Sequence, residues 1–173
     1  MATKFRTEKD SLGPLKVPVD AYYGVQTARA VANFPVSGLR AYPELILAYV
    51  HMKRAAAVVN HKLKMLDKRR RDAIVETCDW ILAEADKLLK QDPLGKHREG
   101  NILDQWVLDI YQAGAGTSFN MNSNEVIANL ANERYGRGKE RPAAAISSST
   151  PTTTSTWRNR PTTRCPPRSA SAT

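Results

Sequence analysis

Hydroxyl and amide side chains gather directly after a glycine-rich turn in the second half of this chain. The stretch reads Gln112-Ala-Gly-Ala-Gly-Thr-Ser-Phe-Asn-Met-Asn-Ser-Asn-Glu-Val-Ile-Ala-Asn129. Gly114 and Gly116 allow a tight turn that leaves space for a ligand, and Thr117 and Ser118 follow where a helical pattern begins. Such a junction combines unpaired N–H groups, hydroxyl donors and the positive end of a helix dipole. It is suited to bind a carboxylate or a phosphate group.

A simpler interpretation explains only part of this stretch. The glycines and hydroxyls alone fit a flexible turn in which Thr117 or Ser118 is the helix N-cap. The asparagines that follow do not fit it, because asparagine is a poor helix former. Asn120 and Asn124 share a helix face one turn apart, which indicates a buried polar network between the loop and a neighbouring helix. The loop matches neither a Walker motif nor a dinucleotide-binding fingerprint.

Helices are the elements that must position this stretch. Apolar residues recur at helical spacing after Pro43, a favourable first helical residue. That stripe comprises Leu45, Ala48, Tyr49, Met52, Ala56, Val59 and Leu63. A second helix is expected to begin after Asp67 as its N-cap and to end before Asp92. Its stripe comprises Ile74, Cys78, Ile81, Leu82, Ala85, Leu88 and Leu89.

The remaining segments complete the prediction of a mainly α fold. Residues 93–106 read as a loop, and a third helix is expected from about Ser118 to about Gly136. Residues 1–40 show little periodicity and read as an irregular arm with turns.

We expect one domain over residues 1–138, with its helical part at 41–138. After residue 139 the composition changes, and thirteen of the seventeen residues at 147–163 are Ser, Thr or Pro. This composition is typical of a disordered, low-complexity segment. We therefore expect residues 139–173 to form a disordered tail outside this domain.

Other side chains form no catalytic or metal-binding pattern. His51 and His61 lie in a helical pattern without a partner cysteine or carboxylate nearby, so we assign neither a catalytic role. Cys78 lies on the apolar stripe and is expected to be a buried, packed thiol. The two cysteines have no metal-binding or disulfide spacing, so no metal site is predicted.

The net charge of +9 is unevenly distributed. Residues 137–173 contain seven basic residues and one acid, which leaves only +3 for the first 136 residues. The basic run Lys68–Arg71 reads as a solvated turn, so nucleic-acid binding is kept only as an alternative. The charged N-terminus has no signal-peptide core and no apolar run is long enough to span a membrane, so we expect a cytoplasmic protein without a membrane partner.

The sequence resembles the aspartase branch of the aspartase/fumarase superfamily over nearly all of residues 5–138. The strongest element is Gln112 to Asn129. Both Tyr22-Tyr23-Gly24 and the loop from Gly114 to Ser118 favour aspartase over class II fumarase. Further matching segments are Phe5-Arg-Thr-Glu-Lys-Asp-Ser-Leu-Gly13, Val17-Pro18, Asp20-Ala-Tyr-Tyr-Gly-Val-Gln-Thr27, Arg29-Ala30 with Asn33-Phe34, and Lys53-Arg54-Ala55-Ala56-Ala57.

The resemblance implies reversible elimination of ammonia from L-aspartate to give fumarate. A base would remove the Cβ proton, and a cage of donors would stabilise an aci-carboxylate dianion. The resemblance implies that Thr117 donates to this dicarboxylate substrate, with Gly116 and Ser118 beside it in the substrate-binding loop. It also implies that no cofactor is needed and that sites are assembled from several subunits of a homotetramer around a central bundle of long helices.

Family members contain a later segment like His-Pro-Asn-Asp-His-Val-Asn-Met-x-Gln-Ser-Thr-Asn-Asp and a mobile loop with the serine base, and neither can be read in this chain. The first appears when Ser149 to Thr163 are back-translated with permitted codons and read from the third base: His-Pro-Asn-Asp-His-Val-Asn-Met-Ala-Gln-Ser-Thr-Asn-Asp. First and second codon positions are nearly all dictated by the residues, and Trp157 has a single codon. We infer an out-of-frame tail, with the shift between about Gly138 and Ser149.

The chain is therefore predicted to be the N-terminal domain of an aspartase, without the long-helix bundle and without a catalytic base. We expect no lyase activity from it alone. The alternative within the enzymes is class II fumarase or another lyase of the superfamily. The alternative outside the enzymes is a small basic helical protein whose tail binds nucleic acid or a membrane surface.

Overall fold

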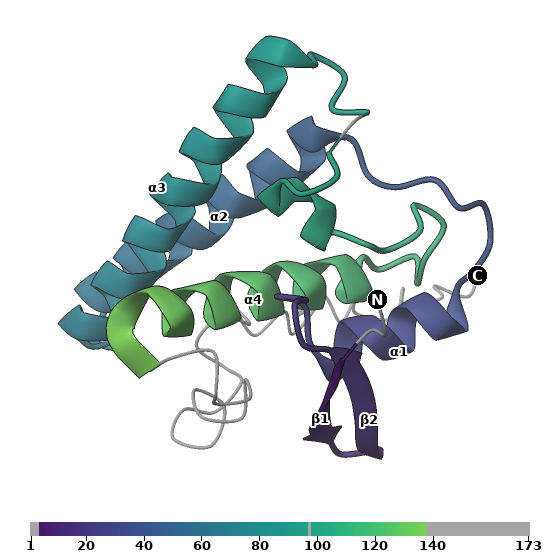
Figure 1. Cartoon of the computed structure of the whole chain (residues 1–173). Helices are drawn as coiled ribbons and strands as arrows, with labels where there is room; N and C mark the ends of the chain where they lie inside the picture. The colour runs from purple at the N-terminus through teal and green to yellow at the C-terminus, as the bar shows by residue number, and fades with distance from the viewer. Residues whose placement is uncertain (1–3, 97, 138–173) are drawn as a thin grey trace, which may run out of the picture.

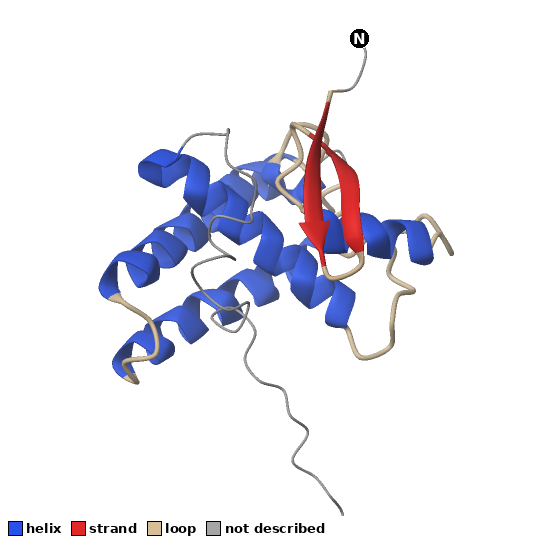
Figure 2. Ribbon diagram, turned by 90° about the horizontal axis from the view of Figure 1, so that it is seen from below, coloured by secondary structure: helices blue, strands red, loops and turns tan. Residues whose placement is uncertain are grey.

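The computed structural model describes residues 4–96 and 98–137, and this part of the chain is mainly helical (Figure 1, Figure 2). Its α-helices are α1 (Val25–Asn33), α2 (Pro43–Lys62), α3 (Lys68–Gln91) and α4 (Thr117–Asn132). The shorter elements are the strands β1 (Phe5–Asp10) and β2 (Gly13–Pro18), the 3-10 turn η1 (Ile102–Gln105) and the π-helical turn η2 (Glu133–Arg137). The predicted mainly α fold is confirmed. The expected tail at 139–173 lies outside the described residues.

The expectation of an irregular arm over residues 1–40 is wrong, because β1, β2 and α1 lie within it. The two strands form an antiparallel hairpin whose turn closes at Gly13, with a φ of +109° that favours glycine. The inward side of β1 carries Arg6, Glu8 and Asp10, while the residues between them are exposed. Because the inward residues are charged, apolar periodicity could not reveal this strand.

Helices α2 and α3 lie side by side and are joined by the turn at residues 63–67 (Figure 1). Asp67 is the N-cap of α3, as predicted, and its side chain accepts a hydrogen bond from the Arg70 N–H at 2.9 Å. Cys78, Ile81 and Ala85 are fully buried, which confirms the inward face predicted for this helix.

The inward face of α2 differs from the predicted stripe. Leu45, Met52 and Leu63 are 47%, 49% and 63% exposed, so these members of the stripe face outward. The buried residues of α2 are Pro43, Ile46, Val50, Lys53, Ala57 and Asn60. This face contains a lysine and an asparagine, whose polar side chains interrupt the apolar spacing and shifted the prediction by one position.

Helix α4 lies between α1 on one side and the α2–α3 pair on the other (Figure 1). It begins at Thr117 and continues through η2 to Arg137, close to the predicted bounds. The core joins α4 to the other elements through Ile46 of α2, Ile81 of α3, Leu103 of η1 and Val126 of α4, among others. Burial on α4 starts at Phe119, so Thr117 at its first position stays exposed.

Candidate functional site

The first turn of α4 is held by its backbone and by a residue from the preceding loop. Gly116 is the N-cap, with φ +70° and ψ +13°, a left-handed conformation that glycine adopts without strain. The prediction of Thr117 or Ser118 as the N-cap is wrong. The N-cap is Gly116, which has no side chain that could accept a hydrogen bond from the helix. Instead, Gln112 Oε1 accepts the N–H of Phe119 at 2.7 Å.

The N–H groups of Thr117 and Ser118 remain open. Within the described part of the chain, neither donates a hydrogen bond, whereas the N–H of Asn120 is already bonded to the Gly116 carbonyl at 3.0 Å. The Thr117 side chain is exposed and that of Ser118 is half-buried. Two backbone donors, two hydroxyls and the positive end of the helix dipole thus meet at one surface position, which can bind a carboxylate.

Helix α2 forms a wall beside this turn. The Tyr49 hydroxyl lies 3.6 Å from the position that a Cβ on Gly116 would occupy. The Tyr49 ring packs edge-on against Phe119, with centroids 4.8 Å apart. One turn further along α2, the Lys53 ammonium donates to Asn120 Oδ1. Burial lowers the pKa of Lys53 to about 8, and the nearby Cys78 acts in the opposite direction.

The asparagines of α4 connect the helix to separate elements rather than forming the single network that was expected. Asn120 binds Lys53 of α2, and Asn122 Nδ2 donates to the Gln105 carbonyl of η1 at 3.0 Å. Asn129 Nδ2 donates to the Tyr22 carbonyl at 2.7 Å. Asn124 is buried and contacts only the Met121 sulfur, at 3.7 Å, among the polar atoms of the described residues. These contacts explain how poor helix formers are retained in α4.

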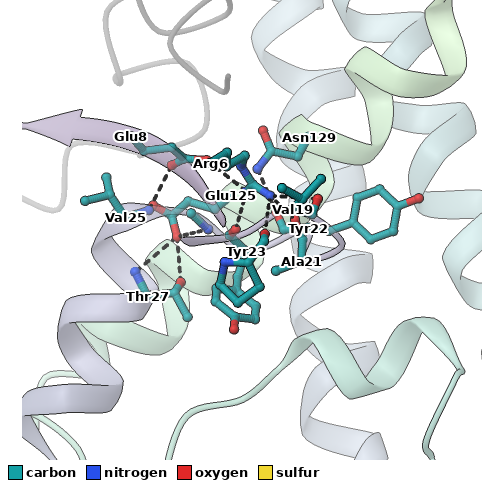
Figure 3. Close-up of polar contacts among 12 residues, drawn as sticks. Arg6, Glu8, Val19, Ala21, Tyr22, Tyr23, Val25, Thr27, Glu125 and Asn129 are labelled. Carbon is teal, nitrogen blue, oxygen red and sulfur yellow. Dashed lines mark hydrogen bonds and ion pairs between the residues drawn. The ribbon is translucent and has the colours of Figure 1, made fainter. Parts of the chain in front are cut away.

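A second polar cluster, which sequence reasoning missed, surrounds the start of α1 (Figure 3). Glu125 of α4 accepts the N–H groups of Gly24, Gln26 and Thr27 at 2.9, 3.0 and 3.1 Å, and the Thr27 hydroxyl at 2.6 Å. Glu8 of β1 accepts the N–H of Val25 at 2.9 Å. Burial raises the pKa of Glu125, while these hydrogen bonds lower it and offset part of the effect.

Gly24 is required by the close approach of both carboxylates. A Cβ at this position would lie 2.8 Å from an oxygen of Glu8 and 2.8 Å from an oxygen of Glu125. Gly24 belongs to one of the segments that resemble aspartases, and in the described chain it has a structural role.

Arg6 of β1 organises the loop that leads into α1 (Figure 3). Its guanidinium donates to the carbonyls of Pro18 and Ala21 at 2.7 Å each and of Tyr23 at 2.8 Å. It also pairs with Glu8 at 2.8 Å. In the sequence, the alternation of Arg6 and Glu8 was the only sign of this inward-facing cluster. A strand whose charged residues face solvent would show the same alternation.

The Tyr22 side chain is fixed from the far end of α4. Its hydroxyl donates to Glu133 at 2.5 Å, and its N–H donates to Gln105 Oε1 at 2.7 Å. Burial, followed by Glu133, raises the pKa of Tyr22 to about 12, so the phenol stays neutral.

The remaining candidate side chains have structural surroundings. Cys78 is buried, and burial raises the pKa of its thiol to about 12, which makes it unreactive as predicted. His61 Nδ1 lies 2.9 Å from the Leu66 carbonyl, and His51 is exposed. In residues 4–96 and 98–137, no three potential metal ligands come together and no helix is long and apolar enough to cross a membrane.

A family described as lyase matches residues 13–149. Aspartate ammonia-lyase of Bacillus sp is 45% identical over 139 residues, which are 80% of this chain and 26% of that protein. Fumarate hydratase class II of Halobacterium salinarum is 44% identical over 136 residues, 79% of this chain and 26% of that protein. The chain thus spans about a quarter of the length of the curated relatives it matches.

Solved structures agree with this likeness. The fumarate lyase:delta crystallin of Brucella melitensis in native form has a TM-score of 0.67 and 40% identity, covering 88% of this chain and 31% of that one. Recombinant class II fumarase of Schistosoma mansoni has a TM-score of 0.59 and 36% identity, covering 76% of this chain and 24% of that one. The motif, the helical fold and the extent of the family match together show that the chain belongs to the aspartase/fumarase superfamily of lyases.

Proposed function

We propose that this chain is the N-terminal segment of an aspartate ammonia-lyase, which converts L-aspartate to fumarate and ammonia. The 45% identity to the Bacillus aspartate ammonia-lyase supports this choice, as do Tyr22-Tyr23-Gly24 and the loop from Gly114 to Ser118. The observation that carries the proposal is the open start of α4, where Thr117 and Ser118 present unbonded N–H groups and hydroxyls.

Gly116, Thr117 and Ser118 form the proposed substrate-binding loop. We expect one substrate carboxylate to accept from the N–H groups of Thr117 and Ser118 and from the Thr117 hydroxyl. In the elimination, a base takes the Cβ proton and the electron pair moves into the adjacent carboxylate, giving an aci-carboxylate dianion. The pair then returns to form the double bond as the C–N bond breaks and ammonia leaves. Fixed donors stabilise the dianion more than the substrate, which accelerates the reaction.

The purified chain is expected to show no turnover, because no described residue is assigned as the base. We propose that the complete enzyme is a homotetramer whose sites combine this loop with residues of other subunits. Fumarate absorbance with L-aspartate as substrate measures activity directly. Clear turnover by this chain alone would contradict the expectation.

Class II fumarase is the second candidate, because the Halobacterium fumarate hydratase is almost as similar, at 44% identity. Both reactions use a dicarboxylate and differ in the leaving group, which is ammonia in one and water in the other. The complete reading frame, expressed and assayed with L-aspartate and L-malate in parallel, distinguishes them. A preference for L-malate would overturn the ammonia-lyase proposal and leave the lyase family intact.

We propose further that the segment after about residue 138 is read in a shifted frame. The family match ends at residue 149, where the back-translated family segment begins. Resequencing the gene through this region tests the proposal. An intact frame, with no lyase-like sequence in the other frames, would refute it.

Ligand binding can be tested on the chain as it exists. In a ¹⁵N NMR titration with fumarate, we expect the amide signals of Gly116, Thr117 and Ser118 to shift. The amides of Gly24 and Val25 provide the internal control, since Glu125 and Glu8 already occupy them. Unchanged signals at Thr117 and Ser118 would overturn the proposed role of the loop.

A further inference from the structure

The amide of Asn120 is oriented by a buried lysine. Lys53 is 8% exposed, and its Nζ donates to Asn120 Oδ1. An ammonium has three donors and no acceptor, so it selects the amide orientation in which oxygen faces α2. The Nδ2 group of Asn120 is left to donate elsewhere, and among the described residues no acceptor binds it.

This free amide group lies beside the proposed substrate loop. Asn120 is three residues after Thr117 and four after Gly116, so it shares their helix face. Side chains on a helix lean toward its N-terminus, which brings the Asn120 amide over the first turn of α4. Tyr49, one turn before Lys53 on α2, has its hydroxyl 3.6 Å from the Cβ position of Gly116. Helix α2 therefore runs along the same turn.

We propose that Asn120 is a further ligand-contacting residue, whose Nδ2 donates to the carboxylate held at Thr117 and Ser118, and that Lys53 is the positioning residue that orients it. This proposal rests on the proposed function of the loop. Lys53 also contributes a positive charge behind the site, in surroundings of low polarity where its attraction for a dicarboxylate is strong.

The charge of Lys53 makes the orientation pH-dependent. Burial lowers the pKa of Lys53 to about 8, opposed by Cys78 of α3. Among the described residues, Cys78 in turn lies near the Arg54–Asp79 ion pair, whose atoms are 2.6 Å apart. Once neutral, an amine accepts as well as donates, so Asn120 is no longer held in one orientation. We expect the affinity for fumarate to fall between about pH 7 and about pH 9.

The first test is the fumarate titration of the whole chain, followed at the side-chain NH₂ signals. Those of Asn120 should shift together with the Thr117 amide, whereas those of Asn129, already donating to the Tyr22 carbonyl at 2.7 Å, should not. Asn120→Asp replaces the donor with a carboxylate that still pairs with Lys53, so folding is kept. Its affinity for fumarate should fall about tenfold or more. Asn132→Asp, the same change at the other end of α4, is the matched control and should have little effect.

The second test addresses Lys53. Lys53→Met should bind fumarate about tenfold more weakly at neutral pH and lose the fall in affinity between about pH 7 and about pH 9. Lys53→Arg keeps a donor that does not titrate, so it should retain affinity at the higher pH. Thermal melts followed by circular dichroism verify that both variants are folded.

The outcomes of these tests distinguish the roles of Asn120 and Lys53 from the proposed role of the substrate-binding loop. If the Thr117 and Ser118 amides respond to fumarate but Asn120→Asp binds as well as the unaltered chain, Asn120 has no contact with the ligand. If Lys53→Met keeps the original pH dependence, Lys53 does not orient the amide. If fumarate leaves the Thr117 and Ser118 amides unchanged, the proposed role of the loop fails, and this inference fails with it.

Discussion

Helices α1 and α4 begin in the same way, but the N–H groups of their first turns differ in their hydrogen bonding. Each follows a glycine N-cap that has no side chain to offer, Gly24 for α1 and Gly116 for α4. At α1, carboxylates of the protein itself accept every N–H from Gly24 to Thr27. At α4, the N–H groups of Thr117 and Ser118 have no acceptor in the described chain.

The difference separates a structural helix start from one that can bind a ligand. Both ends carry the same partial positive charge, equivalent to about half a proton. Glu8 and Glu125 neutralise that charge at α1, which fixes the hairpin and α4 around it. At the start of α4, the side chain that accepts an N–H among the described residues is the neutral Gln112, which bonds to the N–H of Phe119. Its charge remains available to an external carboxylate.

Gly24→Ala should have the largest effect on stability, because it disturbs the start of α1, where every N–H group is bonded. The new Cβ would lie 2.8 Å from oxygens of both Glu8 and Glu125, so both carboxylates must shift from the positions in which they accept the N–H groups of α1. We expect a loss of about 3 kcal/mol in the free energy of unfolding. Urea denaturation measures it, with Gly114→Ala as the control because a Cβ there meets nothing within 4 Å. Equal stabilities of the two variants would contradict the packing described for Gly24.

Glu125→Gln should weaken the same end with a smaller effect. The amide keeps the size of the side chain but loses the charge, and its NH₂ group opposes the N–H donors of α1. The expected loss is about 2 kcal/mol. Glu76→Gln on the exposed side of α3 is the matched control and should change stability little.

The pH profile of the Glu125→Gln variant adds a test of sign. Since burial raises the pKa of Glu125 in the folded state, the native chain binds the proton more tightly than the unfolded one. This group therefore favours the folded state at acidic pH, and that contribution declines as the pH rises through the folded-state pKa. The test is the difference in unfolding free energy between the unaltered chain and Glu125→Gln, measured against pH. If the neighbouring donors kept the pKa of Glu125 at its ordinary value, this difference would show no such decline.

Gln112→Ala tests the start of α4, where the Gln112 side chain caps the helix. It removes the acceptor of the Phe119 N–H, which lies 2.7 Å away, and leaves the α4 core contacts in place. We expect a loss of about 1 kcal/mol in unfolding free energy, typical of a helix cap. A thermal melt is sufficient to detect it, and Gln91→Ala at the exposed end of α3 serves as the control.

Thr117→Ala should have the smallest effect on stability and the clearest effect on binding. The side chain is exposed and bonds to no described residue, so we expect a change within about 0.5 kcal/mol. Fumarate affinity should nevertheless fall several-fold, because one donor to the carboxylate is lost. A variant that is strongly destabilised, yet binds fumarate normally, would reverse the contrast between the two helix starts.

Local signals in the sequence were sufficient for part of this structure. The Asp67 N-cap, the inward face with Cys78 and the start of α4 depend on neighbouring residues, and all three were predicted correctly. The substrate loop was recognisable from its glycines and hydroxyls, although its role remains a proposal. Membership in the lyase family was likewise apparent from the motif and is confirmed.

The features that escaped prediction depend on buried polar groups with distant partners. Glu125 bonds to Gly24 across 101 residues, and Lys53 bonds to Asn120 across 67. Periodicity counts apolar residues, so a buried lysine shifted the predicted face of α2. Such pairs become visible only when the fold brings their elements together.

The long separation between Gly24 and Glu125 has a consequence for synthesis on the ribosome. The chain grows from its N-terminus, so α1 emerges about 100 residues before the carboxylate that completes its first turn. Non-local closure of this kind is slow, because the chain entropy is lost before the contact forms. The paired helices α2 and α3 depend on nearby residues and can form while translation continues. The first residues to be made are thus among the last to reach their native structure, and any event that stops translation before residue 125 leaves them without their partner.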